Sequence, residues 1–258
     1  MSFSYEELAE IRYYIHQHPE LSGQEYQTTA FLKERLEELG IRILESGLKT
    51  GLIAEIGSGQ PVVALRADID ALPILEQTNL PYQSQNPGVM HACGHDFHQT
   101  SLLGAAALLK EKEDQLEGTV RLIFQPAEEI SEGASDVLAT GLLEDVQGII
   151  GFHNIPQLKA GQLALNAGAM MAGVEKFKAT VTGVSSHAAR PDLGVDTVTA
   201  ITTMVQNLQL LISRTVSPFE TAVLSITHLD VGSTWNVLPN QVILKEPFVP
   251  LIQVCKGS

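Results

Sequence analysis

The chain opens with apolar residues at helical spacing. They share one face of a predicted helix and are Leu8, Ile11 and Ile15. Ser4 and Glu7 form a capping-box pattern at its start, and the helix is expected to end near residues 18–19, where proline follows histidine. A second helix is predicted over residues 25–39, because Gly40 is a typical helix stop.

The middle of the chain alternates between strand and helix patterns. Four apolar or β-branched runs predict strands at residues 51–56, 62–67, 119–125 and 148–153. An Ala- and Leu-rich segment predicts a buried helix from His98 to Glu111, and another helix is expected after Gly133. This βα alternation is typical of an α/β fold.

A different organisation begins after Gly168. Alternating residues predict a strand at 175–182, a long amphipathic segment follows at 196–214, and two further strands are predicted at 222–227 and 241–244. The β-α-β-β order indicates a small α+β layer with its helix on one face. We therefore expect two domains, residues 1–168 and residues 169–258.

The segment from Met90 to His98 combines three histidines, a cysteine and an aspartate. Thiolate and neutral imidazole are ligands that suit zinc, manganese and related divalent ions. Gly94 allows a tight turn that directs neighbouring side chains inward. The segment indicates a metal site, and the alternative is a histidine-rich surface loop.

Polar residues also follow the predicted strands. Open α/β sheets bind ligands at the carboxyl ends of their strands, so Asp68, Glu128, Glu129 and His153 are expected along one sheet edge. One glutamate of the pair could bind a metal while its neighbour takes a proton from water. Alternatively, the pair begins a helix, and the aspartate and histidine are turn residues.

Composition narrows the class of protein. The 258 residues are 44% hydrophobic, enough for a substantial core, and the net charge of −14 argues against nucleic acid as a partner. No apolar run approaches a membrane span and the first residues lack a signal pattern, so a cytoplasmic location is expected. Pairing of the two cysteines, Cys93 and Cys255, would sequester a ligand, which favours a reducing compartment.

Four segments together resemble the M20 metallopeptidases. They are Arg66–Pro73, His91–Asp96, Pro126–Glu129 and His153. The chain is most similar to the aminoacylase and hippurate-hydrolase branch, which includes auxin-conjugate amidohydrolases and N-acetyldiaminopimelate deacetylases. The resemblance implies an α/β fold: a mixed-sheet, zinc-peptidase-like catalytic domain with helices on both faces, and an inserted α+β ferredoxin-like lid that mediates a homodimer.

The resemblance also implies roles for individual residues. It implies two divalent ions, Mn²⁺ or Zn²⁺ with Ni²⁺ and Co²⁺ as alternatives, held by Cys93, His95, Glu129 and His153. Glu128 would be the general base, and Asp68 would orient a ligand.

Five other residues lie in less specific patterns. His187 would hold the scissile carbonyl and Asn236 would contact substrate, although both are also ordinary turn residues. His91, Asp96 and His98 lie close to the proposed ligands and are either partners of those ligands or parts of a helix start, so they stay outside the ligand set.

The function implied is a metal-dependent amidohydrolase that cleaves the amide bond of small N-acyl-L-amino acids of the N-acetyl or N-benzoyl type. One alternative is a related enzyme such as an N-acetyldiaminopimelate deacetylase, a dipeptidase or a succinyl-diaminopimelate type deacylase. The last two types generally carry histidine where Arg66 stands and aspartate where Cys93 stands. The other alternative is an impaired, truncated remnant that still binds metal.

The end of the chain departs from the family pattern. Residues 245–258 do not match the family's continuation, which completes the lid and supplies a final histidine ligand, and no residue here is assigned to that ligand. An incomplete lid predicts an exposed strand edge, self-association or lowered stability, and weaker binding of the second ion.

Overall fold

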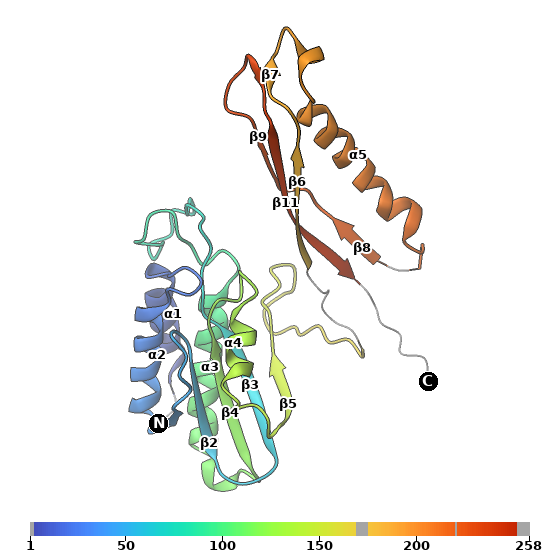
Figure 1. Cartoon of the computed structure of the whole chain (residues 1–258). Helices are drawn as coiled ribbons and strands as arrows, with labels where there is room; N and C mark the ends of the chain where they lie inside the picture. The colour runs from blue at the N-terminus through green and yellow to red at the C-terminus, as the bar shows by residue number, and fades with distance from the viewer. Residues whose placement is uncertain (1–2, 169–174, 220, 252–258) are drawn as a thin grey trace. The chain divides into compact units, whose positions relative to one another are not determined.

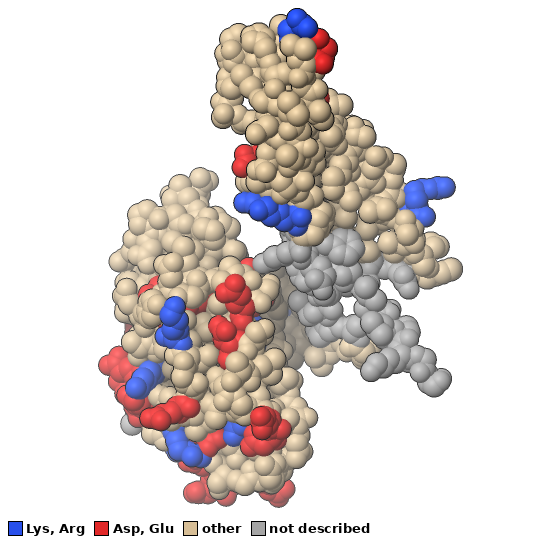
Figure 2. Space-filling view, viewed as in Figure 1, with Lys and Arg blue, Asp and Glu red and all other residues tan. Residues whose placement is uncertain are grey.

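The computed structural model describes residues 3–168, 175–219 and 221–251 (Figure 1). The chain divides into two compact units, residues 1–159 and 160–258, and each is described by itself. The domain boundary expected near residue 168 stays a prediction. Acidic and basic side chains are interspersed on the visible face of the first unit (Figure 2).

Three helices of the first unit come from the segments expected to be helical. They are α1 (Tyr5–Gln17), α2 (Tyr26–Glu38) and α3 (His95–Lys110). The capping box of Ser4 and Glu7 is present in full. Helix α3 begins earlier than the predicted His98, because Gly94 takes a left-handed conformation with φ 88° and serves as the N-cap. The histidine-rich segment is therefore partly the first turn of a helix.

A mixed five-stranded sheet forms the centre of the first unit. Its strands are β1 (Arg42–Leu44), β2 (Leu52–Gly57), β3 (Val62–Asp68), β4 (Thr119–Gln125) and β5 (Val146–Gly151), in the order β1-β2-β4-β3-β5. Strand β2 is antiparallel to β1 and β4, whereas β3 is parallel to β4 and β5. Strand β1 was not predicted, because three residues are too few to show a period. A 3-10 helix, η1 (Glu113–Gln115), precedes β4.

Apolar side chains cover both faces of this sheet. On one face, residues such as Leu32, Leu36 and Leu103 of the helices pack with Leu122 and Phe124 of β4. On the other face, Ile53, Ala64 and Ile123 pack with Val137 of helix α4 (Gly133–Ala139). The residues on the two faces alternate along each strand. The mixed sheet with helices on both faces is confirmed.

The second unit is an antiparallel sheet with one long helix. Its main elements are β6 (Glu175–Thr182), α5 (Thr197–Thr215), β8 (Thr221–Leu224), β9 (His228–Val231) and β11 (Gln241–Leu251). Strand β11 pairs with β6, β8 and β9, and Ile201 of α5 packs on Val242 and Leu244. Strand β9 was not predicted, and β11 extends past the predicted 241–244.

Shorter elements complete the second unit. Strands β7 (Ser186–His187) and β10 (Val237–Leu238) pair with each other, and a 3-10 helix, η2 (Pro191–Leu193), lies between β7 and α5. The α+β composition agrees with the expected layer, while its role as a lid stays a prediction. Within the described ranges, no helix combines the length and apolarity needed to cross a bilayer.

Candidate metal centre

The parallel strands of the first unit bring several polar residues to one edge of the sheet. Asp68 is the last residue of β3, Glu128 and Glu129 follow β4, and His153 follows β5. Strands β3, β4 and β5 run in the same direction, so their carboxyl ends lie together. The sheet topology therefore gathers residues that are far apart in sequence.

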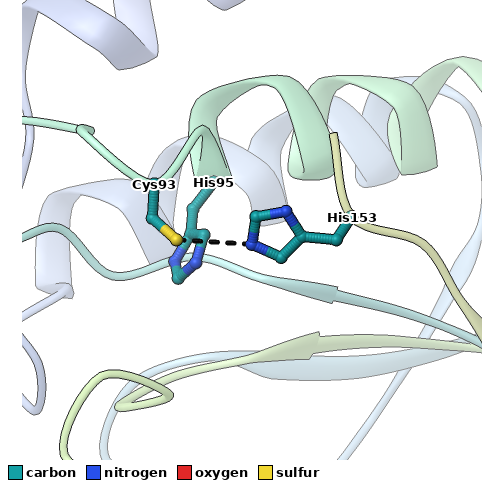
Figure 3. A group of neighbouring side chains, drawn as sticks. All are labelled: Cys93, His95 and His153. Carbon is teal, nitrogen blue, oxygen red and sulfur yellow. Dashed lines mark hydrogen bonds between the residues drawn. The ribbon is translucent and has the colours of Figure 1, made fainter. Parts of the chain in front are cut away.

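Helix α3 and the turn before it bring two further residues to this edge. Cys93 and His95 flank Gly94, the left-handed residue before the helix. The Sγ atom of Cys93 lies 3.3 Å from Nε2 of His153, across 60 residues of sequence (Figure 3). A thiol and two imidazoles thus lie side by side.

His95 is at the centre of the cluster and is 1% exposed. Its Nδ1 lies 2.9 Å from the backbone oxygen of Asp70 and 3.3 Å from that residue's Oδ1. Both partners accept, so Nδ1 carries the proton that it donates, and Nε2 faces the strand ends. Asp70 thereby fixes the direction in which the ring points.

Three carboxylates surround the other side of the His95 ring. Nε2 lies 3.6 Å from Oδ2 of Asp68, 3.7 Å from Oε1 of Glu129 and 3.9 Å from Oε2 of Glu128. Among the described residues, neither His95 Nε2 nor Glu129 Oε1 has a hydrogen-bond partner, although both atoms are buried. Buried polar atoms without partners are costly unless a ligand satisfies them.

In the described part of the chain, three groups of side chains have ligand atoms within 4.8 Å of one another, and each includes His95. The groups are Cys93 with His153, Asp68 with His98, and Glu128 with Glu129. The structure thus brings together the proposed ligands, the proposed base and Asp68 in one place.

The electrostatics of the cluster favour positive charge. Burial by itself lowers the pKa of His95, but the hydrogen bond to Asp70, the nearby Cys93 and the charges of Asp68 and Asp70 raise that pKa to about 11. Without a cation, the ring would carry a second proton. A divalent ion would replace that proton, since ligand histidines bind metals in the neutral form.

The carboxylates respond to the same environment in different ways. Burial raises the pKa of Glu129 above its ordinary value, although the charge of His95 opposes this. Burial also acts to raise the pKa of Asp68, but the hydrogen bond from His98 and nearby positive charges lower it to about 2. Asp68 is therefore a permanent anion at the edge of the site, with Nη1 of Arg66 donating to its Oδ2 at 2.6 Å.

The donor set fits a divalent metal. It offers one thiolate, imidazole nitrogens and carboxylate oxygens, which are the ligands of zinc and of related first-row ions. Nε2 of His95 and Oε1 of Glu129 are buried and have no hydrogen-bond partner among the residues described, so these are the atoms that an ion would satisfy. Cys93, His95, Glu129 and His153 could therefore hold a metal, and their assignment as ligands stays a prediction.

Two of the predicted site residues belong to the second unit. Val237 pairs with His187, and the N–H of Ala188 donates to the oxygen of Asn236 at 2.9 Å, so His187 and Asn236 are neighbours. His187 is exposed. Their role toward the cluster of the first unit stays a prediction.

Residues near the ligands take several structural roles. Asp96 accepts from Nε of Arg12 at 3.0 Å and lies 3.0 Å from Nδ1 of His16, so it joins α3 to α1. His98 lies 2.6 Å from Asp68. Burial lowers the pKa of His91 to about 4, so this ring is neutral near pH 7.

Sequence reasoning did not single out Asp70 or Asn154. Asp70 contacts the His95 ring and also accepts from the N–H of Glu129 at 2.9 Å, while Asn154 contacts His98. Only their positions in the sequence could have pointed to these residues, because Asp70 lies two residues after Asp68 and Asn154 follows His153.

The fold and the cluster define the first unit as an α/β protein with a candidate divalent metal centre at the carboxyl ends of parallel strands. Residues 64–239 match the family description Peptidase family M20/M25/M40. The chain belongs to this family, and the predicted resemblance is confirmed.

Relatives within the family are close. The chain is 48% identical over 241 residues to the N-acetyl-L-cysteine deacetylase of Bacillus subtilis (strain 168), covering 93% of this chain and 58% of the relative. It is 43% identical over 243 residues to the IAA-amino acid hydrolase ILR1-like 5 of Arabidopsis thaliana, covering 94% and 56%.

A solved structure supports the fold. A dinuclear metal-binding peptidase of family M20 from Bacillus subtilis matches with a TM-score of 0.75 and 44% identity, over 95% of this chain and 64% of that protein. The chain spans less than two thirds of the length of these proteins.

Proposed function

We propose that the protein is a metal-dependent hydrolase that cleaves the amide bond of small N-acyl amino acids. The observation that carries the proposal is the buried Nε2 of His95, which lies among carboxylates and has no hydrogen-bond partner in the described part of the chain. The names of the relatives, an N-acetyl-L-cysteine deacetylase and an IAA-amino acid hydrolase, support an acylated amino acid as substrate.

The proposed ligands are Cys93, His95, Glu129 and His153, and two divalent ions would occupy the site, as in the dinuclear peptidase of similar fold. When bound, such ions lower the pKa of water and polarise the amide carbonyl. We propose Mn²⁺ or Zn²⁺ as the native metal, because both suit this mixture of sulfur, nitrogen and oxygen donors.

Glu128 and Glu129 differ in exposure, and this difference supports the roles proposed for them. The side chain of Glu129 is 19% exposed, and its backbone is tied to Asp70, so it is suited to a fixed ligand. The side chain of Glu128 is 41% exposed and borders an open hollow of about 440 Å³ that Arg66, Gln125 and Gly151 also line. Glu128 can therefore reach a substrate and water.

Glu128 would move one proton between two points of the reaction. Its carboxylate takes a proton from the attacking water as the water oxygen bonds to the amide carbon. It then gives that proton to the amine nitrogen as the C–N bond breaks, which releases a carboxylic acid and a free amino acid. Asp68 stays ionised and holds Arg66 and His98 at the edge of the site.

The second unit would complete the active site. By family resemblance, His187 would hold the scissile carbonyl oxygen and Asn236 would contact the substrate, with the unit acting as a lid and as a homodimer interface. We also propose a cytoplasmic location, since a reducing compartment keeps a thiol ligand such as Cys93 free.

The test is a comparison of Glu128→Gln with Glu132→Gln in the whole chain, loaded with Mn²⁺ or Zn²⁺. Glu128→Gln should lower amine release from N-acetyl and N-benzoyl amino acids by at least about 10²-fold, because the proton acceptor is lost. It should keep its metal content, measured by atomic emission. Glu132 is exposed on the same segment, and its replacement should leave turnover unchanged.

Two results would count against the proposal. Full turnover by Glu128→Gln would show that Glu128 is not the general base. No turnover by the unaltered, metal-loaded chain across the substrate panel would leave metal binding without hydrolysis as the function.

A further inference from the structure

His153 lies at the candidate metal centre, on an irregular segment that follows strand β5. Strand β5 ends at Gly151, and His153 is exposed, yet its Nε2 lies 3.3 Å from Sγ of Cys93. A ligand on an irregular segment needs other contacts to keep its position. The next residue, Asn154, supplies them.

Asn154 is joined to the buried ring of His98. Nε2 of His98 lies 2.6 Å from Oδ1 of Asn154 and 3.1 Å from its backbone nitrogen. On the opposite side of the ring, Nδ1 of His98 lies 2.6 Å from Oδ1 of Asp68 and donates to it, since an ionised carboxylate can only accept. His98 is 1% exposed, so both contacts are protected from water.

The same ring packs against the two residues before Asn154. The centroid of the His98 ring lies 5.1 Å from that of Phe152 and 4.6 Å from that of His153, both in edge-on geometry. His98 therefore contacts three consecutive residues of the segment. It fixes this segment relative to helix α3, which begins with the ligand His95.

The Asn154 amide also lies directly on the turn between two proposed ligands. A Cβ atom at Gly94 would come within 2.3 Å of Oδ1 and 2.6 Å of Nδ2 of Asn154. Gly94 has φ 88°, a conformation that also favours glycine. Glycine between Cys93 and His95 thus leaves the space that the amide occupies.

We propose that Asn154, held by His98, is a positioning residue for the metal centre: it docks the His153 segment on the Cys93–His95 turn and so sets His153 beside Cys93. This inference rests on the proposed function, because it concerns the ligands of the proposed metals. According to this inference, metal binding depends on the side-chain amide of Asn154, although that amide does not bind the metal itself.

The test follows Co²⁺ binding to the metal-free whole chain by absorption. Cysteine ligation gives a thiolate-to-cobalt charge-transfer band in the near ultraviolet, which reports on the Cys93 environment without any turnover. Asn154→Ala should weaken Co²⁺ binding roughly 10- to 100-fold and lower the band at limiting cobalt, as is usual when a group that orients a ligand is removed.

Gln147→Ala is the matched control. Gln147 is exposed on β5, and its side chain donates to Oε1 of Gln60 at 3.4 Å, away from the metal centre. This variant should bind Co²⁺ as the unaltered chain does. Asn154→Ser replaces the alanine variant if the latter does not fold in the metal-free form.

The outcomes separate the inference from the proposed function. If the unaltered chain gives no thiolate band with Co²⁺, the proposed metal centre fails. If it gives the band and a folded Asn154→Ala or Asn154→Ser chain binds Co²⁺ equally well, the positioning role is overturned. It is also overturned if both shortened variants are unfolded without metal, because Asn154 would then be a structural residue.

Discussion

The carboxylate of Glu25 and the backbone of Ala127, 102 positions apart, are joined by a buried hydrogen bond in which Oε1 accepts from the N–H at 2.8 Å. Glu25 is the N-cap residue of α2 and is fully buried. Ala127 has φ 49° and begins the turn that carries Glu128 and Glu129. The start of a helix thus holds the turn that supplies the proposed base and a proposed ligand.

Replacement of Glu25 by alanine should disturb both stability and the site. The N–H of Ala127 would lose its partner in a buried position, at a cost of about 1–3 kcal/mol in the free energy of unfolding. Denaturant unfolding can be followed by near-ultraviolet dichroism of the tyrosines, all of which lie in the first unit. Glu10→Ala, an exposed change on α1, is the control and should leave the unfolding midpoint nearly unchanged. Equal midpoints for the two variants would contradict the expected role of Glu25.

Residue 133 must be glycine because the backbone of Pro126 lies directly against it. A Cβ atom there would come within 1.6 Å of the backbone oxygen of Pro126, so either α4 or the turn after β4 would have to move. Gly133→Ala should therefore destabilise the first unit by at least about 1–3 kcal/mol and lower metal binding, because Glu129 follows that turn. Gly148→Ala is the control, since nothing lies within 4 Å of a Cβ at Gly148. Thermal unfolding and metal content should separate the two variants.

Local sequence signals predicted most of the first unit. The capping box at Ser4 marks a helix start by side-chain chemistry alone. The strands β3 and β4 appear as mainly apolar runs, each interrupted by one arginine, because both faces of the sheet are covered. Helix α3 begins three residues before the predicted His98, at His95. The prediction missed this start because the first turn of the helix contains polar site residues rather than an apolar stripe. Strands β1 and β9 are too short to show a period.

The candidate site was predictable in its residue types but not in its supporting contacts. Ligand-type residues at strand ends are visible in the sequence because parallel strands share one edge. The contact of Asp70 with His95, and that of Asn154 with Gly94, depend on how α3 and the segment after β5 approach each other. No local pattern encodes that approach, so these residues become apparent only in three dimensions.

A second polar cluster predicts how stability depends on pH. His16 on α1 lies 3.0 Å from Oδ2 of Asp96 on α3 and 3.1 Å from Oε1 of Glu76, and Arg12 also donates to Asp96. Burial lowers the pKa of His16, but its hydrogen bonds to the two carboxylates outweigh this and raise it above 6.5. Burial acts to raise the pKa values of Asp96 and Glu76, yet both are lowered overall, in each case partly by a hydrogen bond to His16.

The stabilisation from His16 should therefore be fully present below about pH 6.5 and be lost as pH rises through the raised pKa of the folded chain. At the acid end it should fade as Asp96 and Glu76 take up protons. His16→Gln should cost about 1–3 kcal/mol near pH 6 and progressively less toward pH 9, measured by denaturant unfolding. Gln17→Ala changes no titratable group, so its effect should be the same at every pH. A cost of His16→Gln that does not vary between pH 6 and pH 9 would exclude a charged His16.

Removal of metal should lower the stability of the first unit, because the proposed ligands join three separate parts of it. Cys93 and His95 lie at the start of α3, Glu129 follows β4, and His153 follows β5. A free metal concentration of about 100 times the dissociation constant adds about 2.7 kcal/mol to the free energy of unfolding, so a chelator should lower the tyrosine-detected midpoint accordingly. Cys93→Ser should start from the lower midpoint and respond little to the chelator. A midpoint of the unaltered chain that is the same with zinc and with chelator would show that no metal links these three segments.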